Sequence, residues 1–282
     1  MKIGVASGKG GTGKTTIATN LALSIDNCQF LDCDVEEPNA HIFLQPEITK
    51  TEDVTINVPL IDIKKCTNCG ICSNACEYNA LIQIPNNVLF FSELCLSCNA
   101  CKELCPESAI TMQKKIVGQL NVGKTETGID FANGELLISL PRAIPIVIAV
   151  KEQIDESKTI ILDAPPGNSC LVIETIHDVD YCLLVTEPTP FGLWDLKIAV
   201  QVTRIFNLPI GIIINRSGIG DDAVIEKYCI AEKIPILMKI PFDRSIAQAY
   251  SKGIPLVKFD SEWLEKFRIL YQRILSEVEN HG

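Results

Sequence analysis

Short apolar runs alternate with amphipathic stretches along most of the chain. Apolar runs of four to six residues are typical of buried strands, and they occur at residues 3–6, 30–33, 159–162, 181–185, 210–214 and 236–240. Stretches with helical spacing of apolar residues lie at about 15–25, 143–154, 194–206, 221–231, 244–252 and 261–279. Buried strands that alternate with helices predict an α/β fold with a doubly wound, mainly parallel sheet.

The alternation is interrupted by a cysteine-rich segment at residues 57–115. We therefore expect one discontinuous domain, made of residues 1–56 and 116–282, with a small α+β domain inserted at 57–115. Residues 116–142 are richer in Gly, Thr and Asn and are expected to form a hairpin or bridge back to the sheet. The segment holds two copies of the spacing C-x2-C-x2-C-x3-C, and the second copy follows the first by 29 residues.

Three thiolates at this spacing can bind three irons of one iron–sulfur cube, and the fourth lies on the departing turn, where it can reach a second cube. Structural zinc is the alternative, but zinc sites favour two separated pairs of ligands around one ion. Residues 57–115 resemble a two-cluster ferredoxin domain of the bacterial type, although Glu77 stands where the first motif usually has proline. The resemblance implies one 4Fe–4S cluster on Cys66, Cys69, Cys72 and Cys105, and another on Cys95, Cys98, Cys101 and Cys76.

A glycine-rich loop follows the first predicted strand. Residues 8–15 have the pattern G-x4-G-K-T between a strand and a helix, which is the context that a phosphate-binding loop requires. Its backbone N–H groups would bind phosphates at the helix N-terminus. Lys14 would contact the β and γ phosphates, and the Thr15 hydroxyl would bind Mg²⁺. The expected contacts to ATP or ADP are Gly8, Lys9, Gly10, Gly11, Thr12, Gly13, Lys14, Thr15 and Thr16.

Lys9 makes this loop more specific. Residues 9–16, KGGTGKTT, resemble the deviant Walker A motif of the MinD/ParA/Mrp superfamily of P-loop ATPases, to which the nitrogenase iron protein is related. In that superfamily the additional lysine reaches across a dimer to the partner's nucleotide. The resemblance therefore implies a catalytic role for Lys9 in a homodimer, or in a heterodimer with a paralogous ATPase.

The same resemblance extends to later strand ends. It implies that Asp34 positions or deprotonates the attacking water, that Asp32 lies nearer the magnesium shell, and that Asp163 holds Mg²⁺ through water. Aspartates at strand ends also commonly cap helices, which is the alternative for Asp243. For the adenine base, the resemblance implies contacts from Asn215, Pro241 and Asp243.

Charge and hydropathy restrict the partners. The 282 residues carry a formal net charge of −10, which opposes binding to nucleic acid or to an anionic membrane. No apolar run approaches the roughly 18 residues of a membrane span, and the first strand leads directly into the glycine loop, without room for a signal peptide. We expect a cytoplasmic protein without stable membrane insertion, in which 13 cysteines remain reduced.

The resemblance implies a Mg²⁺-dependent ATPase that dimerises on ATP and couples its nucleotide state to the two clusters. Its output would be low-potential electron transfer to, or iron–sulfur assembly on, a metalloprotein or redox client. One alternative is an amide-forming enzyme like cobyrinic acid a,c-diamide synthase, which shares the P-loop fold but has an added glutaminase domain. Another is a positioning ATPase like MinD or ParA, which would not need eight cluster ligands.

Overall fold

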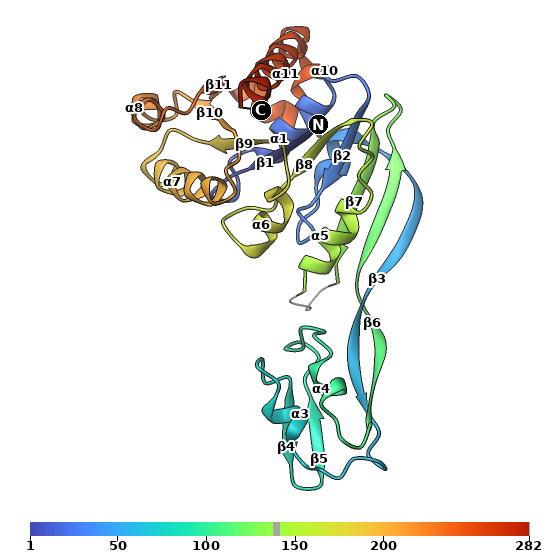
Figure 1. Ribbon diagram of the computed structural model, residues 1–282. Helices are drawn as coiled ribbons and strands as arrows, with labels where there is room; N and C mark the ends of the chain where they lie inside the picture. Colours follow the sequence, from blue (N-terminus) through green and yellow to red (C-terminus); the bar gives the residue numbers. More distant parts are fainter. Residues whose placement is uncertain (138–141, 282) are drawn as a thin grey trace.

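The computed structural model describes residues 1–137 and 142–281, and one large sheet dominates this part (Figure 1). Within these residues the sheet has nine strands in the order β11-β10-β9-β1-β8-β2-β7-β6-β3. Pairing is parallel from β11 to β7 and antiparallel for β7–β6 and β6–β3. The strands are β1 (Lys2–Ala6), β2 (Cys28–Asp32), β3 (Glu47–Ile61), β6 (Ile110–Lys124), β7 (Asp130–Leu136), β8 (Thr159–Asp163), β9 (Tyr181–Thr186), β10 (Ile210–Ser217) and β11 (Ile236–Pro241).

Helices cover both faces of the sheet, because successive strand residues point to opposite sides. Leu31, Leu162 and Leu184 belong to a core on the face of α5 (Ile144–Lys151), α6 (Cys170–Ile176), α7 (Pro190–Ile205) and α8 (Asp222–Glu232). Their neighbours Phe30, Ile161 and Leu183 belong to a core on the opposite face. That face carries α1 (Lys14–Ala22), α2 (Ala40–Leu44), α9 (Arg244–Ser251), α10 (Leu256–Phe259) and α11 (Ser261–His281).

The six predicted strands all coincide with strands of this sheet, and the six predicted helices coincide with α1, α5, α7, α8, α9 and α11. The predicted doubly wound and mainly parallel architecture is therefore confirmed. Helix α11 packs on the sheet through Trp263, Phe267, Leu270 and Ile274. Among the described residues, we find no helix with the length and apolar character needed to cross a bilayer.

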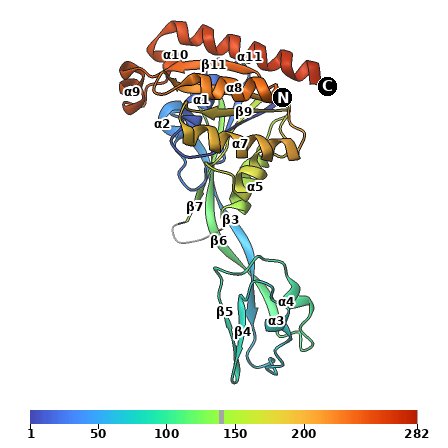
Figure 2. The same cartoon turned by 90° about the vertical axis from the view of Figure 1, so that its left-hand side faces the viewer.

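β3 and β6 extend well beyond the sheet as a two-stranded ribbon (Figure 2). They pair from Glu47 with Lys124 to Ile61 with Ile110, whereas β6 also pairs with β7 only from Gly118 onward. Residues 55–61 and 110–116 therefore form the free ribbon, which is about 20 Å long at about 3.3 Å per residue. The expected domain boundaries at 56/57 and 115/116 fall inside these two strands.

Residues 62–109, which we call the cysteine lobe, lie at the far end of the ribbon (Figures 1 and 2). The lobe contains α3 (Ile71–Asn74), β4 (Leu81–Ile84), β5 (Asn87–Phe90) and α4 (Ala100–Glu103). Its two halves exchange equivalent main-chain bonds: Asp62 donates its N–H to the Ala109 oxygen and Phe91 donates to the Ala80 oxygen, both at 2.8 Å. Left-handed backbone positions recur with the 29-residue repeat, in the pairs Asn68 and Ser97, Gly70 and Asn99, and Asn79 and Ser108.

Candidate functional site

The glycine-rich loop connects β1 to α1 and requires glycine at specific positions. Gly11 and Gly13 have φ of 77° and 90°, a region that L side chains rarely adopt. A Cβ at Gly13 would overlap the side-chain amide of Asn215, and a Cβ at Gly8 would overlap the backbone of α7. The Asn215 amide donates a hydrogen bond of 2.7 Å to the Thr12 oxygen. A residue at the end of β10 thus holds the phosphate-binding loop in place.

Two carboxylates lie beside this loop at the ends of neighbouring strands. Asp163 ends β8 and is 1% exposed, and neither of its carboxylate oxygens has a hydrogen-bond partner within residues 1–137 and 142–281. Asp34 follows β2 and is 7% exposed, and one of its oxygens has no partner in the same part of the chain. Lys14 and Thr15 of α1 are also buried. Buried carboxylate oxygens without partners fit a hydrated Mg²⁺, which prefers oxygen ligands.

Burial dominates the acid–base behaviour of both carboxylates. Burial raises the pKa of Asp163 from 3.8 to about 6, against the lowering effect of Lys14. It also raises the pKa of Asp34 from 3.8 to about 6, against the lowering effect of Lys14. The single positive charge of Lys14 therefore does not offset the cost of burying two negatively charged carboxylates. A bound divalent cation would supply the missing positive charge.

Asp32 has a different environment from its two neighbours. It is fully buried, and its two oxygens accept the N–H groups of Asp34 and Ala40, each at 3.1 Å. Burial, followed by the charge of Asp163, raises its pKa well above the usual range. These two bonds fix the conformation of the loop between β2 and α2. That Asp32 lies near a bound Mg²⁺ stays a prediction.

We expect Asp163→Asn to stabilise the Mg²⁺-free chain, and to do so more strongly at pH 7.5 than at pH 5. Because the folded-state pKa of Asp163 is raised, the native state binds more protons than the unfolded state between about pH 4 and pH 6. This group's contribution to stability therefore falls as pH rises through that window. Asparagine is neutral throughout, so the variant's advantage in the free energy of unfolding should grow by about 1 kcal/mol from pH 5 to 7.5. Denaturant titrations of both proteins at pH 5 and pH 7.5 measure this difference in the free energy of unfolding. A difference that is the same at both pH values would contradict the prediction.

Lys9 forms an ion pair with Glu187, the residue that follows β9. The Glu187 side chain is 9% exposed, and its other oxygen accepts a bond of 3.1 Å from Arg216. Sequence reasoning missed Glu187, although an acidic residue directly after an apolar strand was a signal of the kind used for Asp34 and Asp163. In this structure the lysine expected to act across a dimer is held within its own chain.

A pocket opens beside the glycine-rich loop on the side away from the carboxylates. Gly11, Gly13 and Thr16 line it from the loop and α1, and Asn215, Pro241 and Asp243 line it from the ends of β10 and β11. The structure thus brings together the residues expected at the adenine base. Asp243 also caps α9 by accepting the Ser245 N–H at 2.6 Å, as its alternative interpretation expected. Phe242, which lies in the loop expected to close over the base, and Tyr250, which the sequence had not indicated, add aromatic surface to the pocket.

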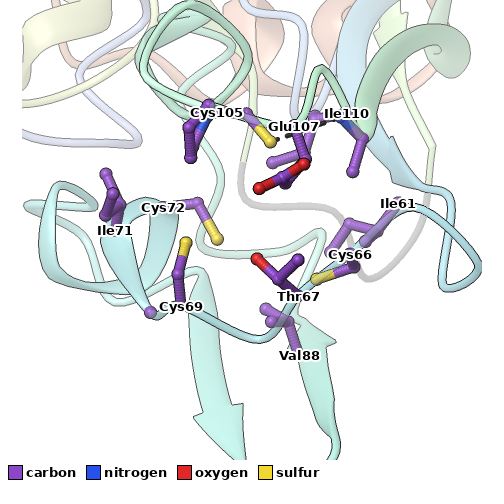
Figure 3. A pocket seen from close by; sticks show the side chains of 13 residues that line it. Ile61, Cys66, Thr67, Cys69, Ile71, Cys72, Val88, Cys105, Glu107 and Ile110 are labelled. Carbon is purple, nitrogen blue, oxygen red and sulfur yellow. Dashed lines mark hydrogen bonds between the residues drawn. The ribbon is translucent and has the colours of Figure 1, made fainter.

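The eight cysteines of the lobe divide between two pockets. Figure 3 shows one of them, with the sulfur atoms of four cysteines turned toward a shared space. Each pocket combines three cysteines of one motif with the last cysteine of the other. The first is lined by Cys66, Cys69, Cys72 and Cys105, and the second by Cys76, Cys95, Cys98 and Cys101.

The crossing cysteines have equivalent surroundings. The Ala80 N–H donates to the Cys76 sulfur at 3.2 Å, and the Ala109 N–H donates to the Cys105 sulfur at 3.3 Å. Burial, followed by the neighbouring Cys95, raises the pKa of the Cys101 thiol to about 11. Without a bound metal this thiol is protonated at neutral pH, so binding of iron would release its proton.

The thiols of each pocket are not gathered around one ion. Over residues 1–137 and 142–281, no group of three or more His, Cys, Asp and Glu side chains is arranged to hold a metal ion.

Comparison with known proteins places this geometry in a family. Residues 3–256 match the family model described as the CobQ/CobB/MinD/ParA nucleotide binding domain. An uncharacterized protein of Methanocaldococcus jannaschii is 34% identical over 270 residues, which cover 92% of this chain and 93% of that protein. The iron–sulfur cluster carrier protein of the same organism is 25% identical over an aligned length of 298 positions, gaps included, and the match covers 99% of this chain and 85% of the relative.

The fold is similar to that of a solved septum site-determining protein MinD from Pyrococcus horikoshii, which is complexed with Mg-ADP. The TM-score is 0.59 at 19% identity, with 100% of this chain and 98% of the MinD chain covered. This likeness shows a shared fold. The chain belongs to the CobQ/CobB/MinD/ParA family of nucleotide-binding domains.

Proposed function

We propose that the chain is a Mg²⁺-dependent ATPase that controls two 4Fe–4S clusters on an inserted domain of the bacterial ferredoxin type. The arrangement of the eight cysteines carries this proposal, since three thiols of one motif and the last thiol of the other line each pocket. That crossing is the pattern of two-cluster ferredoxins. The output is low-potential electron transfer to a client metalloprotein, or assembly of an iron–sulfur cluster on it.

In the nucleotide site, the backbone N–H groups of residues 8–13 bind the phosphates and Lys14 neutralises them. Thr15 and Asp163 hold Mg²⁺, which fits the unpartnered oxygens of Asp163. Asp34 orients the attacking water and accepts its proton, for which a pKa near 6 is suitable. Lys9 acts on the nucleotide of a second protomer, identical or paralogous.

In the cysteine lobe, the two pockets hold one cluster each. A bound cluster supplies a one-electron carrier. The N–H groups of Ala80 and Ala109 donate hydrogen bonds to the sulfur atoms of Cys76 and Cys105, the two cysteines that cross to the other motif's pocket. Such clusters persist in a reducing compartment, so we place the protein in the cytoplasm.

A relative that is named an iron–sulfur cluster carrier protein supports a role in iron–sulfur metabolism rather than in spatial positioning. A positioning ATPase has no use for eight thiols in two pockets. The client is therefore a protein that receives electrons or a cluster from the lobe.

The proposal predicts that the anaerobically reconstituted chain binds about eight irons and about eight sulfides. It also predicts that Mg²⁺ and ATP bind with turnover that requires Asp34. Iron and sulfide analysis, EPR after reduction, and phosphate release measure these properties. Zinc in stoichiometric amounts with no iron after reconstitution would contradict the cluster assignment.

Lys14→Ala tests the nucleotide-binding part of the proposal separately from the clusters. Without its charge the phosphates in the loop lose a charge-assisted partner, and nucleotide binding should be lost. The iron content of this variant should stay unchanged, because Lys14 lies in α1 and the cysteines lie in the lobe. ATP turnover by Lys14→Ala at the native rate would mean that hydrolysis occurs elsewhere.

A further inference from the structure

The ribbon leaves the sheet at the end where the parallel strands have their carboxyl ends, which is also the end that carries the nucleotide site. β7 is parallel to β2, with Asn133 opposite Asp32. β6 is antiparallel to β7, with Gly118 opposite Leu136, the last residue of β7. The part of β6 before Gly118 therefore extends past the carboxyl ends of β2 and β7, where Asp34 also lies. The cysteine lobe, at the far end of the ribbon, therefore lies beyond these carboxyl ends (Figure 1).

Two consecutive residues at the end of β7 connect the Asp34 loop to the ribbon. Leu136 donates its N–H to the oxygen of Val35 at 2.9 Å, and Val35 follows Asp34 directly. Leu137 donates its N–H to the oxygen of Val117 in β6 at 3.0 Å. A main-chain route of two hydrogen bonds thus joins the loop beside the phosphates to the point where the ribbon begins.

Val117 is an extra residue in β6 at this point. The pairing of Val54 with Gly118 is followed by that of Thr55 with Ile116, so Val117 has no opposite residue in β3. Such a bulge bends its strand and increases the local twist. It stands where the ribbon separates from the sheet, and it accepts the Leu137 bond described above. The direction in which the ribbon projects is therefore set at Val117.

The side chains at this junction are packed without spare room. Val35 is fully buried, and Val117 is 1% exposed in the same core. A Cβ added at Gly134 or at Gly118 would overlap Ile146 of α5. Because interiors packed at this density transmit displacement rather than absorb it, a shift of Val35 must be accompanied by a shift of the ribbon junction.

The same core continues along the ribbon into the lobe. It includes Ile56 and Val58 of β3, and then Ala80 and Cys95. Cys72 and Cys101 belong to a separate small core within the lobe. The pocket that contains Cys95 is therefore joined to the nucleotide domain by continuous apolar packing.

We infer that residues 33–39, the end of β7 and the bulge at Val117 form one coupling element, through which nucleotide state sets the orientation of the cysteine lobe. This inference rests on the proposed function, since it requires nucleotide to bind beside Asp34. The displacement reaches first the pocket of Cys76, Cys95, Cys98 and Cys101 through the shared core.

The test is hydrogen exchange of the full cluster-loaded chain, measured without nucleotide, with Mg-ADP, and with Mg²⁺ and a non-hydrolysable ATP analogue. We expect the exchange rates of the Leu136 and Leu137 amides and of residues 110–118 to differ between states by at least about fivefold, the lower end of measured couplings between sites. Amides of residues 83–87, at the turn of the β4–β5 hairpin, should not respond, because these residues line neither cysteine pocket.

Residues 8–15 report separately on nucleotide binding. Protection of these amides without any change at Leu136, Leu137 and 110–118 would overturn the coupling and leave the proposed function standing. A P-loop that does not respond to any nucleotide would overturn both.

Val35→Ala gives a second test, with Val179→Ala as its matched control. Both remove the same two methyl groups from the same core, but Val179 packs beside Gly4 of β1, away from the ribbon. We expect Val35→Ala to keep P-loop protection and to lose the response at residues 110–118. The control should keep both responses. An unchanged ribbon response in Val35→Ala would overturn the role of this side chain.

Discussion

Replacing Cys66 and Cys105 together by serine is expected to remove one iron–sulfur cluster and to leave the other in place. The two thiols are 39 positions apart in the sequence but line the same pocket, so the second replacement adds no further loss. Serine does not substitute well, because its hydroxyl does not supply the soft sulfur ligand that iron–sulfur clusters use. About four of about eight irons per chain should remain after anaerobic reconstitution.

Cys66→Ser combined with Cys76→Ser is the matched comparison. These cysteines lie in one motif but line different pockets, so both clusters should be lost. If each motif held its own cluster, the two double variants would give the opposite iron contents. Cys170→Ser, which replaces an exposed thiol of α6 outside the lobe, should keep all the iron. Iron and sulfide analysis with EPR of the reduced proteins therefore decides the pairing of the ligands.

The main sheet and the phosphate-binding loop could be predicted because their signals are local. Apolar runs such as those around Ile3 and Ile161 are buried on both faces of a parallel sheet, and such strands differ from helices in length. The glycine pattern at residues 8–15 specifies a backbone shape directly, and Gly11 and Gly13 have the positive φ that it implies. The crossed division of the cysteines was implied by the resemblance to two-cluster ferredoxins.

The ribbon could not be predicted in the same way. β3 begins with seven exposed residues, 47–53, and has no apolar run in that part. It is a strand because β6 pairs with it, at separations that run from 49 positions (Ile61 with Ile110) to 77 positions (Glu47 with Lys124). Propensity and periodicity carry no information about such a distant partner. The coupling of Val35 to Val117 was hidden for the same reason.

The Lys9–Glu187 pair shows another limit of sequence reasoning. The motif indicates that Lys9 is unusual, but not where the side chain rests when no partner is bound. Glu187 is 178 positions away and reaches Lys9 only because β9 lies beside β1 in the sheet. Arg216 satisfies the second oxygen of Glu187, so the carboxylate keeps a partner when Lys9 leaves.

Lys9→Ala is expected to lower the rate of ATP hydrolysis by about 10³-fold or more while ATP binding changes little. A cation supplied across an interface to the phosphates contributes effects of this size in related phosphoryl transfers. Binding should persist, because Lys14 and the loop N–H groups belong to the same protomer as the nucleotide. Equilibrium binding of ATP, phosphate release and sedimentation in parallel measure the three properties. Loss of ATP binding together with turnover would show that Lys9 acts within its own chain.

Glu187→Gln is expected to favour ATP-dependent association of two protomers. Glutamine keeps the size of the side chain but removes the charge that holds Lys9, so less free energy is needed to turn Lys9 toward a partner. We expect ATP-dependent dimerisation to tighten by about tenfold, which corresponds to about 1.4 kcal/mol. The double variant Lys9→Ala with Glu187→Gln completes a thermodynamic cycle, and there the effect of Glu187→Gln should vanish. An equal tightening in the presence and absence of Lys9 would mean that Glu187 acts on the dimer by another contact.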